Sequence, residues 1–263
     1  MLIVIKGAGD LASGIAYRLR KSGFDIIMTE IEKPTTVRRT VAFSQAIFDN
    51  EITIEGIKGV KVNSIDEINE AISKGNIPII IDEKAEIVSK LKPNVVVDSI
   101  IAKKNLGTSI DDAPIVIGVG PGFEAQVDCD LVVETKRGHY LGKVIEKGSA
   151  IPNTGVPGNI GGYTKERIIR ASANGKIKPI VKIGDFVKKG EVVAYVDEEE
   201  VLAQIDGIVR GMLQENIEVF KGMKAGDIDP RCERDHCFTI SDKARSIGGG
   251  VLEAIMYMSN KNK

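Results

Sequence analysis

The 263-residue sequence is poor in aromatic and sulfur-bearing side chains. It has no tryptophan, five tyrosines, seven phenylalanines and three cysteines. The shortage of aromatics argues against a base-stacking platform for single-stranded nucleic acid. Cys129, Cys232 and Cys237 are too few, and odd in number, for the disulfide framework of a secreted protein. These absences favour a protein of the cytoplasm.

The sequence also lacks an excess of charge of either sign. Lysine plus arginine total 36, aspartate plus glutamate total 37, and the net charge is -1. No strong field for nucleic acid or an anionic membrane follows from this balance. No apolar run approaches the roughly 20 residues of a spanning helix. The sequence therefore predicts neither a nucleic-acid nor a membrane partner.

Glycine is abundant, with 28 residues, and its first cluster lies in the most informative stretch. Residues 2–5 read as a buried strand, residues 6–10 as a glycine-rich turn, and a helix begins at Leu11. Gly7, Gly9 and Ala12 fit the pattern Gly-x-Gly-x-x-Ala, and Asp10 lies within it. The start of a helix favours an anion. We therefore predict a cofactor phosphate here.

Charged residues after the second expected strand extend this hypothesis. Glu30 follows the glycines by about 20 residues, where a dinucleotide-binding fold places an acid on a ribose hydroxyl. A solvated charge at a strand end is the alternative. Arg38 and Arg39 could grip a phosphate by bidentate hydrogen bonds, or could be surface charges that open a helix over residues 39–48.

Strands alternate with helices up to about residue 133, which predicts an α/β domain with a Rossmann-like, doubly wound parallel sheet. A second glycine turn follows the strand at 115–119 and contains Gly118, Gly120 and Gly122. Because the carboxyl ends of parallel strands face one crevice, we expect this turn to contact the same cofactor.

The densest group of reactive side chains follows the next strand. Glu134, Arg137 and His139 could supply an acid, an anion clamp and a base, so they are the catalytic candidates. We expect this group to lie beside the turn at 118–123. The alternative is a polar strand end in which Arg137 pairs with Glu134.

The pattern changes beyond residue 150. Residues 152–162 read as a linker or a mobile binding loop. Short strand signals separated by glycines then predict a β-rich module over 163–240, with two weakly repeated halves. Residues 1–155 would form the nucleotide-binding domain, and residues 241–263 a C-terminal helix that packs back. Gly248–Gly250 would seat an anion before that helix or allow it to pack tightly.

One further group, Cys232, His236 and Cys237, contains soft metal ligands. The adjacency of His236 and Cys237 and the lack of a fourth ligand favour unligated thiols, so no metal site is predicted. Whether these residues contact a selenium species is left open.

The sequence resembles the YqeB family, accessory proteins of the selenium-dependent molybdenum hydroxylase system. The resemblance implies a role in maturing or inserting a labile selenium-containing cofactor in a xanthine dehydrogenase-like enzyme. It implies the apo-enzyme and other maturation proteins as partners, and a homo-oligomer is a further candidate state. The matching stretches are residues 6–14, 34–43, 118–123, 134–142, 153–158, 227–231 and 241–253.

Three functions compete at this point. The first is a maturation factor that binds a dinucleotide-type cofactor, with NAD(P) or a molybdopterin dinucleotide as the candidates. The second is an NAD(P)-dependent oxidoreductase with Glu30 on the ribose and His139 as acid or base. The third is a non-catalytic scaffold for partner proteins. The family resemblance and the lack of a substrate-specific dehydrogenase signature favour the first.

A second resemblance concerns the β-rich module. Residues 184–193 and 203–211 resemble the biotinyl/lipoyl-type barrel-sandwich fold, whose members attach a cofactor to a lysine at a hairpin tip. The corresponding tip here, Val196–Val201, contains no lysine. The module is therefore interpreted as structural or as a docking surface, without covalent biotin or lipoate.

This departure gives a direct test by intact-mass spectrometry of the native protein. The mass of the bare chain, 28.4 kDa, is expected because the hairpin tip has no lysine amine to acylate. A stable biotin or lipoyl adduct near Glu198 would contradict the interpretation.

Overall fold

The computed structural model describes residues 1–155 and 158–261, and the chain forms two compact units. The first unit comprises Met1–Pro34, Ala42–Thr154 and Ile240–Lys263, and the second comprises Thr35–Val41 and Gly155–Thr239. The chain thus enters the second unit twice, once through a short segment. Val156 and Pro157, within the expected loop at 152–162, lie outside the described residues.

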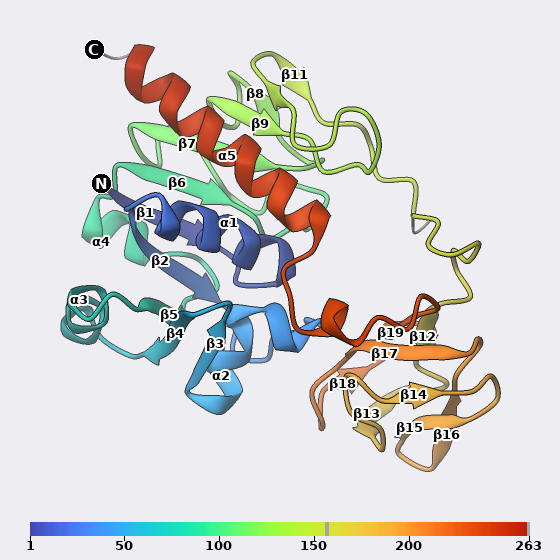
Figure 1. The fold of residues 1–263 in the computed structure, drawn as a ribbon. Helices are drawn as coiled ribbons and strands as arrows, with labels where there is room; N and C mark the ends of the chain where they lie inside the picture. The colour runs from blue at the N-terminus through green and yellow to red at the C-terminus, as the bar shows by residue number, and fades with distance from the viewer. Residues whose placement is uncertain (156–157, 262–263) are drawn as a thin grey trace. The chain divides into compact units, whose positions relative to one another are not determined.

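A nine-stranded sheet forms the centre of the first unit (Figure 1), in the order β10-β9-β7-β6-β1-β2-β5-β4-β3. Its strands are β1 (Leu2–Lys6), β2 (Asp25–Glu30), β3 (Glu51–Ile54), β4 (Ile57–Val62), β5 (Ile77–Ile81), β6 (Val95–Asp98), β7 (Ile115–Val119), β9 (Leu131–Val133) and β10 (Val144–Ile145). A small ladder pairs β8 (Glu124–Ala125) with β11 (Gly148–Ser149).

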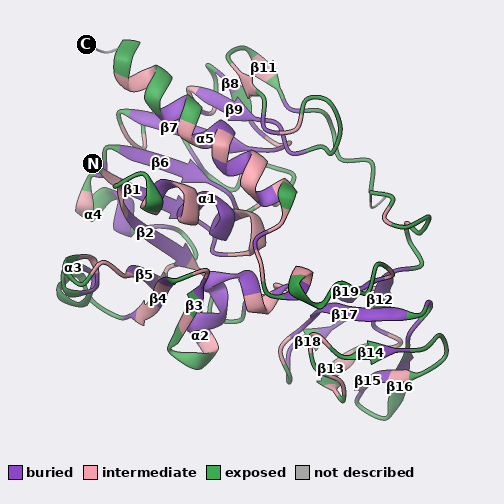
Figure 2. Ribbon diagram, viewed as in Figure 1, coloured by how far each residue is buried: buried purple, intermediate pink, exposed green. Residues whose placement is uncertain are grey.

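Helices cover both faces of this sheet. Successive side chains of a strand point to opposite faces, so each face carries apolar side chains that a layer of helices buries. Ile3 and Ile5 belong to a core that α1 (Asp10–Lys21) and α5 (Asp242–Lys261) share. Val4 belongs to a second core with α3 (Ile65–Ser73) and α4 (Ile87–Leu91). Figure 2 shows the buried strands between these layers. The remaining short helices are η1 (Arg39–Val41), η2 (Phe43–Gln45), α2 (Ala46–Asp49) and η3 (Arg234–Cys237).

The expected doubly wound parallel sheet is wrong, because the sheet is mixed. Edge strands β3 and β10 pair antiparallel with their neighbours. The β3–β4 hairpin turns through Glu55 and Gly56, both with positive φ, which suits a tight two-residue turn between antiparallel strands. The connections from β6 to β7 and from β7 to β9 contain no helix among the described residues. α5 contacts β7, β9 and β10 and covers the sheet there.

The second unit contains two four-stranded antiparallel sheets, in the orders β12-β19-β17-β14 and β16-β15-β13-β18. Their strands are β12 (Ile168–Arg170), β13 (Gly175–Pro179), β14 (Phe186–Val187), β15 (Val192–Val196), β16 (Glu199–Leu202), β17 (Gly207–Met212), β18 (Glu218–Val219) and β19 (Lys224–Asp229). The expected biotinyl-like barrel-sandwich is also wrong: in the described part of the chain the unit consists of two antiparallel sheets that no strand pairing joins. The repeat seen in the sequence corresponds to β14 and β18, each at the edge of one sheet.

The contact between α1 and α5 depends on glycine. A Cβ atom at Gly14 would lie 2.6 Å from the Ala244 Cβ, and one at Gly248 would lie 2.8 Å from the Gly14 carbonyl oxygen. Because Gly14 meets Ala244 and Arg18 meets Gly248, the helices run parallel and their N-terminal ends lie at the same end. Gly248–Gly250 therefore lie inside α5, not before it, and serve helix packing.

Two adjacent glycines in α5 test this packing. A Cβ at Gly250 would collide with the carbonyl oxygen of Gly142, whereas a Cβ at Gly249 meets nothing within 4 Å. We expect Gly250→Ala to lower the free energy of unfolding by about 2 kcal/mol or more. Gly249→Ala should raise it by up to ~1 kcal/mol, because alanine favours the helix. Equal effects in urea denaturation would show that backbone packing does not require Gly250.

Candidate functional site

The turn between β1 and α1 is held by main-chain and side-chain hydrogen bonds. Gly7 has φ +91° and donates its N–H to the Thr29 carbonyl at 2.9 Å. A Cβ at Gly7 would lie 3.1 Å from the Ser99 carbonyl oxygen, so a larger residue would disturb the turn. Ser13 Oγ donates to the Ala8 carbonyl at 3.2 Å and accepts the Phe43 N–H at 2.8 Å. The turn is therefore pre-shaped.

The start of α1 directly follows the glycine turn. Gly9 is the N-cap residue, and no side chain caps the helix there. Asp10 is the first helical residue, and Ala12 is fully buried against the sheet. Because the first N–H groups of a helix have no acceptors within it, they are available to a ligand.

Glu30 holds the same turn. Its carboxylate accepts N–H groups of Ala8 and Ile31, both at 2.9 Å. Burial raises its pKa above the ordinary value, and these two hydrogen bonds oppose the rise. The carboxylate therefore connects β2 to the glycine turn, and its contact with a ribose stays a prediction.

The second glycine turn is filled by protein atoms. Cβ atoms at Gly118 and Gly120 would lie 2.6 Å from the Phe123 ring and 2.8 Å from Thr135 Oγ1. A Cβ at Gly122, which has φ +114°, would lie 2.6 Å from the Lys104 main-chain nitrogen. These three glycines permit close packing of the chain; cofactor contact by them stays a prediction.

The Glu134 side chain holds two segments of the backbone together. Its buried carboxylate accepts the N–H groups of Thr135 and Lys136 at one oxygen and of Ile151 at the other, each at 2.8 Å. The side chain thereby ties the end of β9 to the segment after β11. With three donors on its two oxygens, it is poorly placed to exchange a proton with a substrate.

Arg137 and His139 do not join Glu134. Arg137 forms a bidentate ion pair with Asp242, the first residue of α5, at 2.6 and 2.8 Å. His139 is exposed and packs its ring edge to face against Tyr140, with ring centroids 4.9 Å apart. In residues 1–155 and 158–261, no hydrogen bond or ion pair links Glu134 or His139 to Arg137. The structure therefore does not assemble the predicted acid–base pair.

Lys243 is the cation that the sequence analysis missed. It is partly buried at the start of α5 and makes no hydrogen bond or ion pair among the described residues. Burial lowers the pKa of its ammonium, the charge of Arg137 lowers it further, and the carboxylates of Asp10, Glu134 and Asp242 oppose both effects. We call Gly9, Asp10, Arg137, Asp242 and Lys243 the helix-start site.

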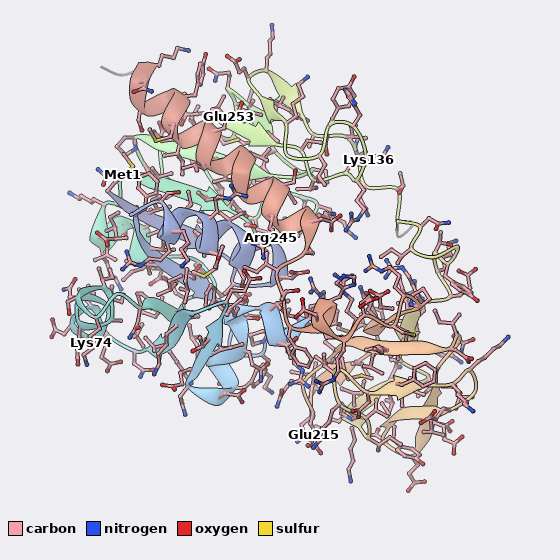
Figure 3. The ribbon with its side chains drawn as sticks, viewed as in Figure 1. Met1, Lys74, Lys136, Glu215, Arg245 and Glu253 are labelled. Carbon is pink, nitrogen blue, oxygen red and sulfur yellow. The ribbon has the colours of Figure 1, made fainter. Side chains whose placement is uncertain are left out.

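A carboxylate outside the site fixes the start of α5. Glu55, in the β3–β4 turn, accepts two hydrogen bonds from Arg245 at 2.6 and 2.7 Å and the Ile240 N–H at 2.8 Å. Arg245 lies near the first turn of α5 (Figure 3). The Ser241 hydroxyl accepts the Ala244 N–H at 3.1 Å. A serine directly before Asp242 is the feature of the sequence from which this helix start could have been predicted.

The two arginines predicted to bind phosphate belong to the second unit. Arg38 Nη2 donates to the carbonyls of His236 and Thr239, both at 3.0 Å. Arg39 donates to the Met212 carbonyl and to Gln214 Oε1, both at 2.7 Å.

The three cysteines form no disulfide in the described part of the chain. Burial raises the pKa of Cys129 to about 12, so this thiol is unreactive. Burial also raises the pKa of Cys237, whereas Cys232 is exposed. No group of three or more metal-binding side chains occurs in the described part of the chain.

Sequence comparison relates the chain to a known protein. No protein-family model matches it. Over 260 residues it is 52% identical to the uncharacterized protein YqeB of Escherichia coli (strain K12). The chain is a relative of YqeB. The match covers 99% of this chain and 48% of YqeB, so the chain spans about half the length of this curated relative.

Solved structures give only slight likenesses. An aspartoacylase family protein from Mesorhizobium loti has a TM-score of 0.28 at 8% identity. A succinylglutamate desuccinylase/aspartoacylase from Rhodobacter sphaeroides has a TM-score of 0.28 at 13% identity. Each match covers 86% of this chain and 84% of the other. Likenesses this slight carry no argument about activity. None of the described helices has the length and apolar character needed to cross a bilayer.

Lys243 gives a prediction about stability and pH. Between its lowered folded-state pKa and the ordinary value of 10.5, the unfolded chain binds more protons, so stability rises with pH through this range. At pH 7, well below 10.5, the unfolded chain carries this charge in water, and placing Lys243 in its partly buried position costs stability. Lys243→Met should therefore raise the Tm of the ligand-free protein at pH 7, with a gain that shrinks toward pH 10.

The control is Lys261→Met at the far end of the same helix, where the lysine is exposed. It should leave the Tm within experimental error at both pH values. A lower Tm for Lys243→Met at pH 7 would mean that Lys243 has a stabilising partner.

Proposed function

We propose that this chain is an accessory factor that binds a phosphate-bearing, dinucleotide-type cofactor at the helix-start site, in the maturation of a molybdenum hydroxylase. The observation that carries the binding half is Lys243, a partly buried ammonium that forms no hydrogen bond or ion pair among the described residues and lies near Asp10, the first residue of the uncapped helix α1. The maturation half comes from the sequence resemblance to the YqeB family.

The main-chain arrangement supports an anionic ligand. α1 and α5 run parallel, so the positive ends of both helix dipoles lie together. A phosphate there would accept N–H groups from the first turn of α1 and a charge-assisted hydrogen bond from Lys243. Lys243 forms no hydrogen bond or ion pair among the described residues, and the N-cap residue Gly9 has no side chain to cap the first N–H groups of α1.

The neighbouring carboxylates do not cancel this attraction. Asp242 is paired with Arg137, and the carboxylate of Glu134 is solvated by three N–H groups. Asp10, the first residue of α1, is the third carboxylate near Lys243. We therefore expect Asp10→Asn to strengthen the binding of an anion, because it removes one negative charge.

The residues fit a binding protein better than an oxidoreductase. A dehydrogenase needs a group that exchanges a proton with substrate, and Glu134 is fully engaged while His139 is exposed on the loop after β9. The helix-start site supplies charge and hydrogen-bond donors, which suffice for holding a cofactor and passing it to an apo-enzyme.

Binding is tested by the fluorescence of added NADH, with a pterin dinucleotide as competitor. Lys243→Gln should weaken binding of whichever dinucleotide the wild type holds by about tenfold or more, because charge-assisted hydrogen bonds contribute about 1.5–3 kcal/mol. Lys261→Gln is the matched control and should bind like the wild type. Equal affinity of the Lys243→Gln and wild-type proteins, or no binding by the wild type, would overturn the proposed site.

The same pair of variants tests the maturation role in the native host. Lys243→Gln should lower the selenium-dependent activity of the molybdenum hydroxylase while Lys261→Gln leaves it unchanged. Mass spectrometry of small molecules released from the native protein would identify the cofactor.

A further inference from the structure

The second unit contains a buried carboxylate surrounded by cationic groups. Asp229, at the end of β19, is 1% exposed and accepts the Arg231 main-chain N–H at 3.1 Å, its Nε at 2.9 Å and its Nη2 at 2.6 Å. Arg210 Nε and His236 Nδ1 lie 3.8 and 3.9 Å from the same carboxylate. Burial pushes the pKa of Asp229 up, but Arg231 and Arg210 outweigh it and hold the pKa below its ordinary value.

Two hydrogen bonds place Arg38 beside Arg210. Arg210 Nε and Arg38 Nη2 donate to the same carbonyl oxygen, that of His236, at 3.2 and 3.0 Å. Two guanidinium groups on one oxygen must lie close together. Both side chains are almost completely buried, at 7% and 6% exposure. We call Arg38, Arg210, Arg231, His236 and Asp229 the Asp229 cluster.

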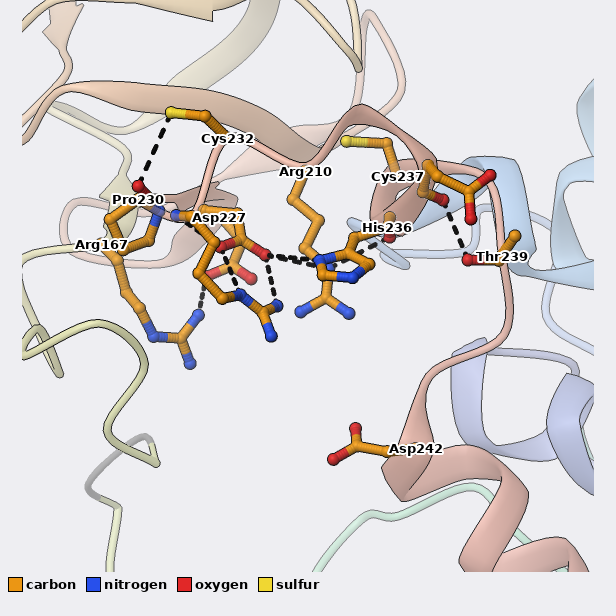
Figure 4. Close-up of polar contacts among 12 residues, drawn as sticks. Arg167, Arg210, Asp227, Pro230, Cys232, His236, Cys237, Thr239 and Asp242 are labelled. Atoms are coloured by element: carbon orange, nitrogen blue, oxygen red, sulfur yellow. Dashed lines mark hydrogen bonds and ion pairs between the residues drawn. The ribbon is translucent and has the colours of Figure 1, made fainter.

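Arg167, from the segment before β12, adds a nitrogen without a hydrogen-bond acceptor. It pairs with Asp227 through Nη1, and its side chain is nine-tenths buried. Its Nε is buried and unpartnered, as is Nδ1 of His236. An unsatisfied buried polar group costs about 1–3 kcal/mol. Figure 4 shows the side chains of Arg167 and Arg210 extending from the same side of this part of the chain.

The cluster is also reachable from solvent. The Arg231 side chain is 41% exposed and that of His236 is 38% exposed. Two members of the cluster are therefore accessible to a ligand from solvent. Guanidinium groups are rigid, permanently charged forks that match the oxygens of phosphate.

From this convergence we infer that the Asp229 cluster, with Arg167, binds a phosphate-type oxyanion. The site lies wholly within the second unit and does not rest on the helix-start site of the first. The oxyanion has two sources, free inorganic phosphate or the phosphate group of a nucleotide, and both present the same oxygens to the arginines.

The test is calorimetric titration of the full chain with inorganic phosphate and, separately, with AMP. The wild type should bind at least one of them. Arg231→Gln and Arg167→Gln should each weaken that binding about tenfold or more. The control is Arg170→Gln, an exposed arginine of the same unit that donates to the Gly222 carbonyl, and it should bind normally. Tighter binding of AMP than of phosphate would identify a nucleotide as the source.

Further variants keep the outcome decisive. Arg167→Gln leaves Asp227 without its ion-pair partner and can impair folding. A second variant, Arg231→Lys, avoids this problem because it keeps the positive charge. It loses the bidentate geometry and should also weaken binding. Lys243→Gln distinguishes this site from the helix-start site, because it can remove only the phosphate binding that belongs to the first unit. If Lys243→Gln alone abolishes phosphate binding, the anion binds in the first unit, and the inference fails while the proposed function stands. Absence of binding to both ligands, or normal binding by Arg231→Lys and Arg231→Gln, also overturns the inference.

Discussion

The first unit depends on a backbone-to-backbone contact between two parallel helices. Gly14 of α1 and Gly248 of α5 lack side chains at the point where the helices meet, and any Cβ there would press on main-chain atoms. Parallel helices direct their dipoles the same way, which is unfavourable unless negative charge gathers at the shared N-terminal end. Asp10 and Asp242 lie in the first turns and supply part of that charge. An anionic ligand would supply more.

Acidic residues around this contact serve mainly to hold loops. Glu30, Glu55 and Glu134 each accept main-chain N–H groups, from the glycine turn, the segment before α5 and the loop after β9. A buried carboxylate must find donors, and the N–H groups of loops have no partner in the sheet. The sequence shows such residues as candidates for chemistry because their hydrogen-bond partners are not visible in it.

Local features were the most predictable from the sequence. The strand–turn–helix at residues 2–21 formed where its apolar spacing placed it. A similarly local contact defines the start of α3, where the Ser64 hydroxyl accepts the Glu67 N–H. In both segments the determining contacts lie within a few residues of one another.

Features that depend on residues far apart in the chain were missed. Local propensity disfavours Gly248–Gly250 within a helix, yet packing against Gly14 and Gly142 places them inside α5. The expected alternation of strands and helices failed beyond β6 for a related reason. The helix that covers β7 and β9 comes from the end of the chain, so the connections between those strands need no helix of their own. Arg137 could not be paired correctly, because Asp242 becomes its neighbour only when α5 packs back.

The two binding proposals rest on the same physical principle but on different cations. Folding normally gives each buried charge or polar nitrogen a partner, and a group left without one lowers stability. Lys243 in the first unit and Arg167 Nε in the second are such groups. A lysine is a flexible point charge whose protonation responds to its surroundings, which suits reversible holding of a ligand. Clustered arginines stay charged and fix the orientation of the oxyanion. The first arrangement suits a cofactor that must be passed on, and the second suits a phosphate that anchors its ligand.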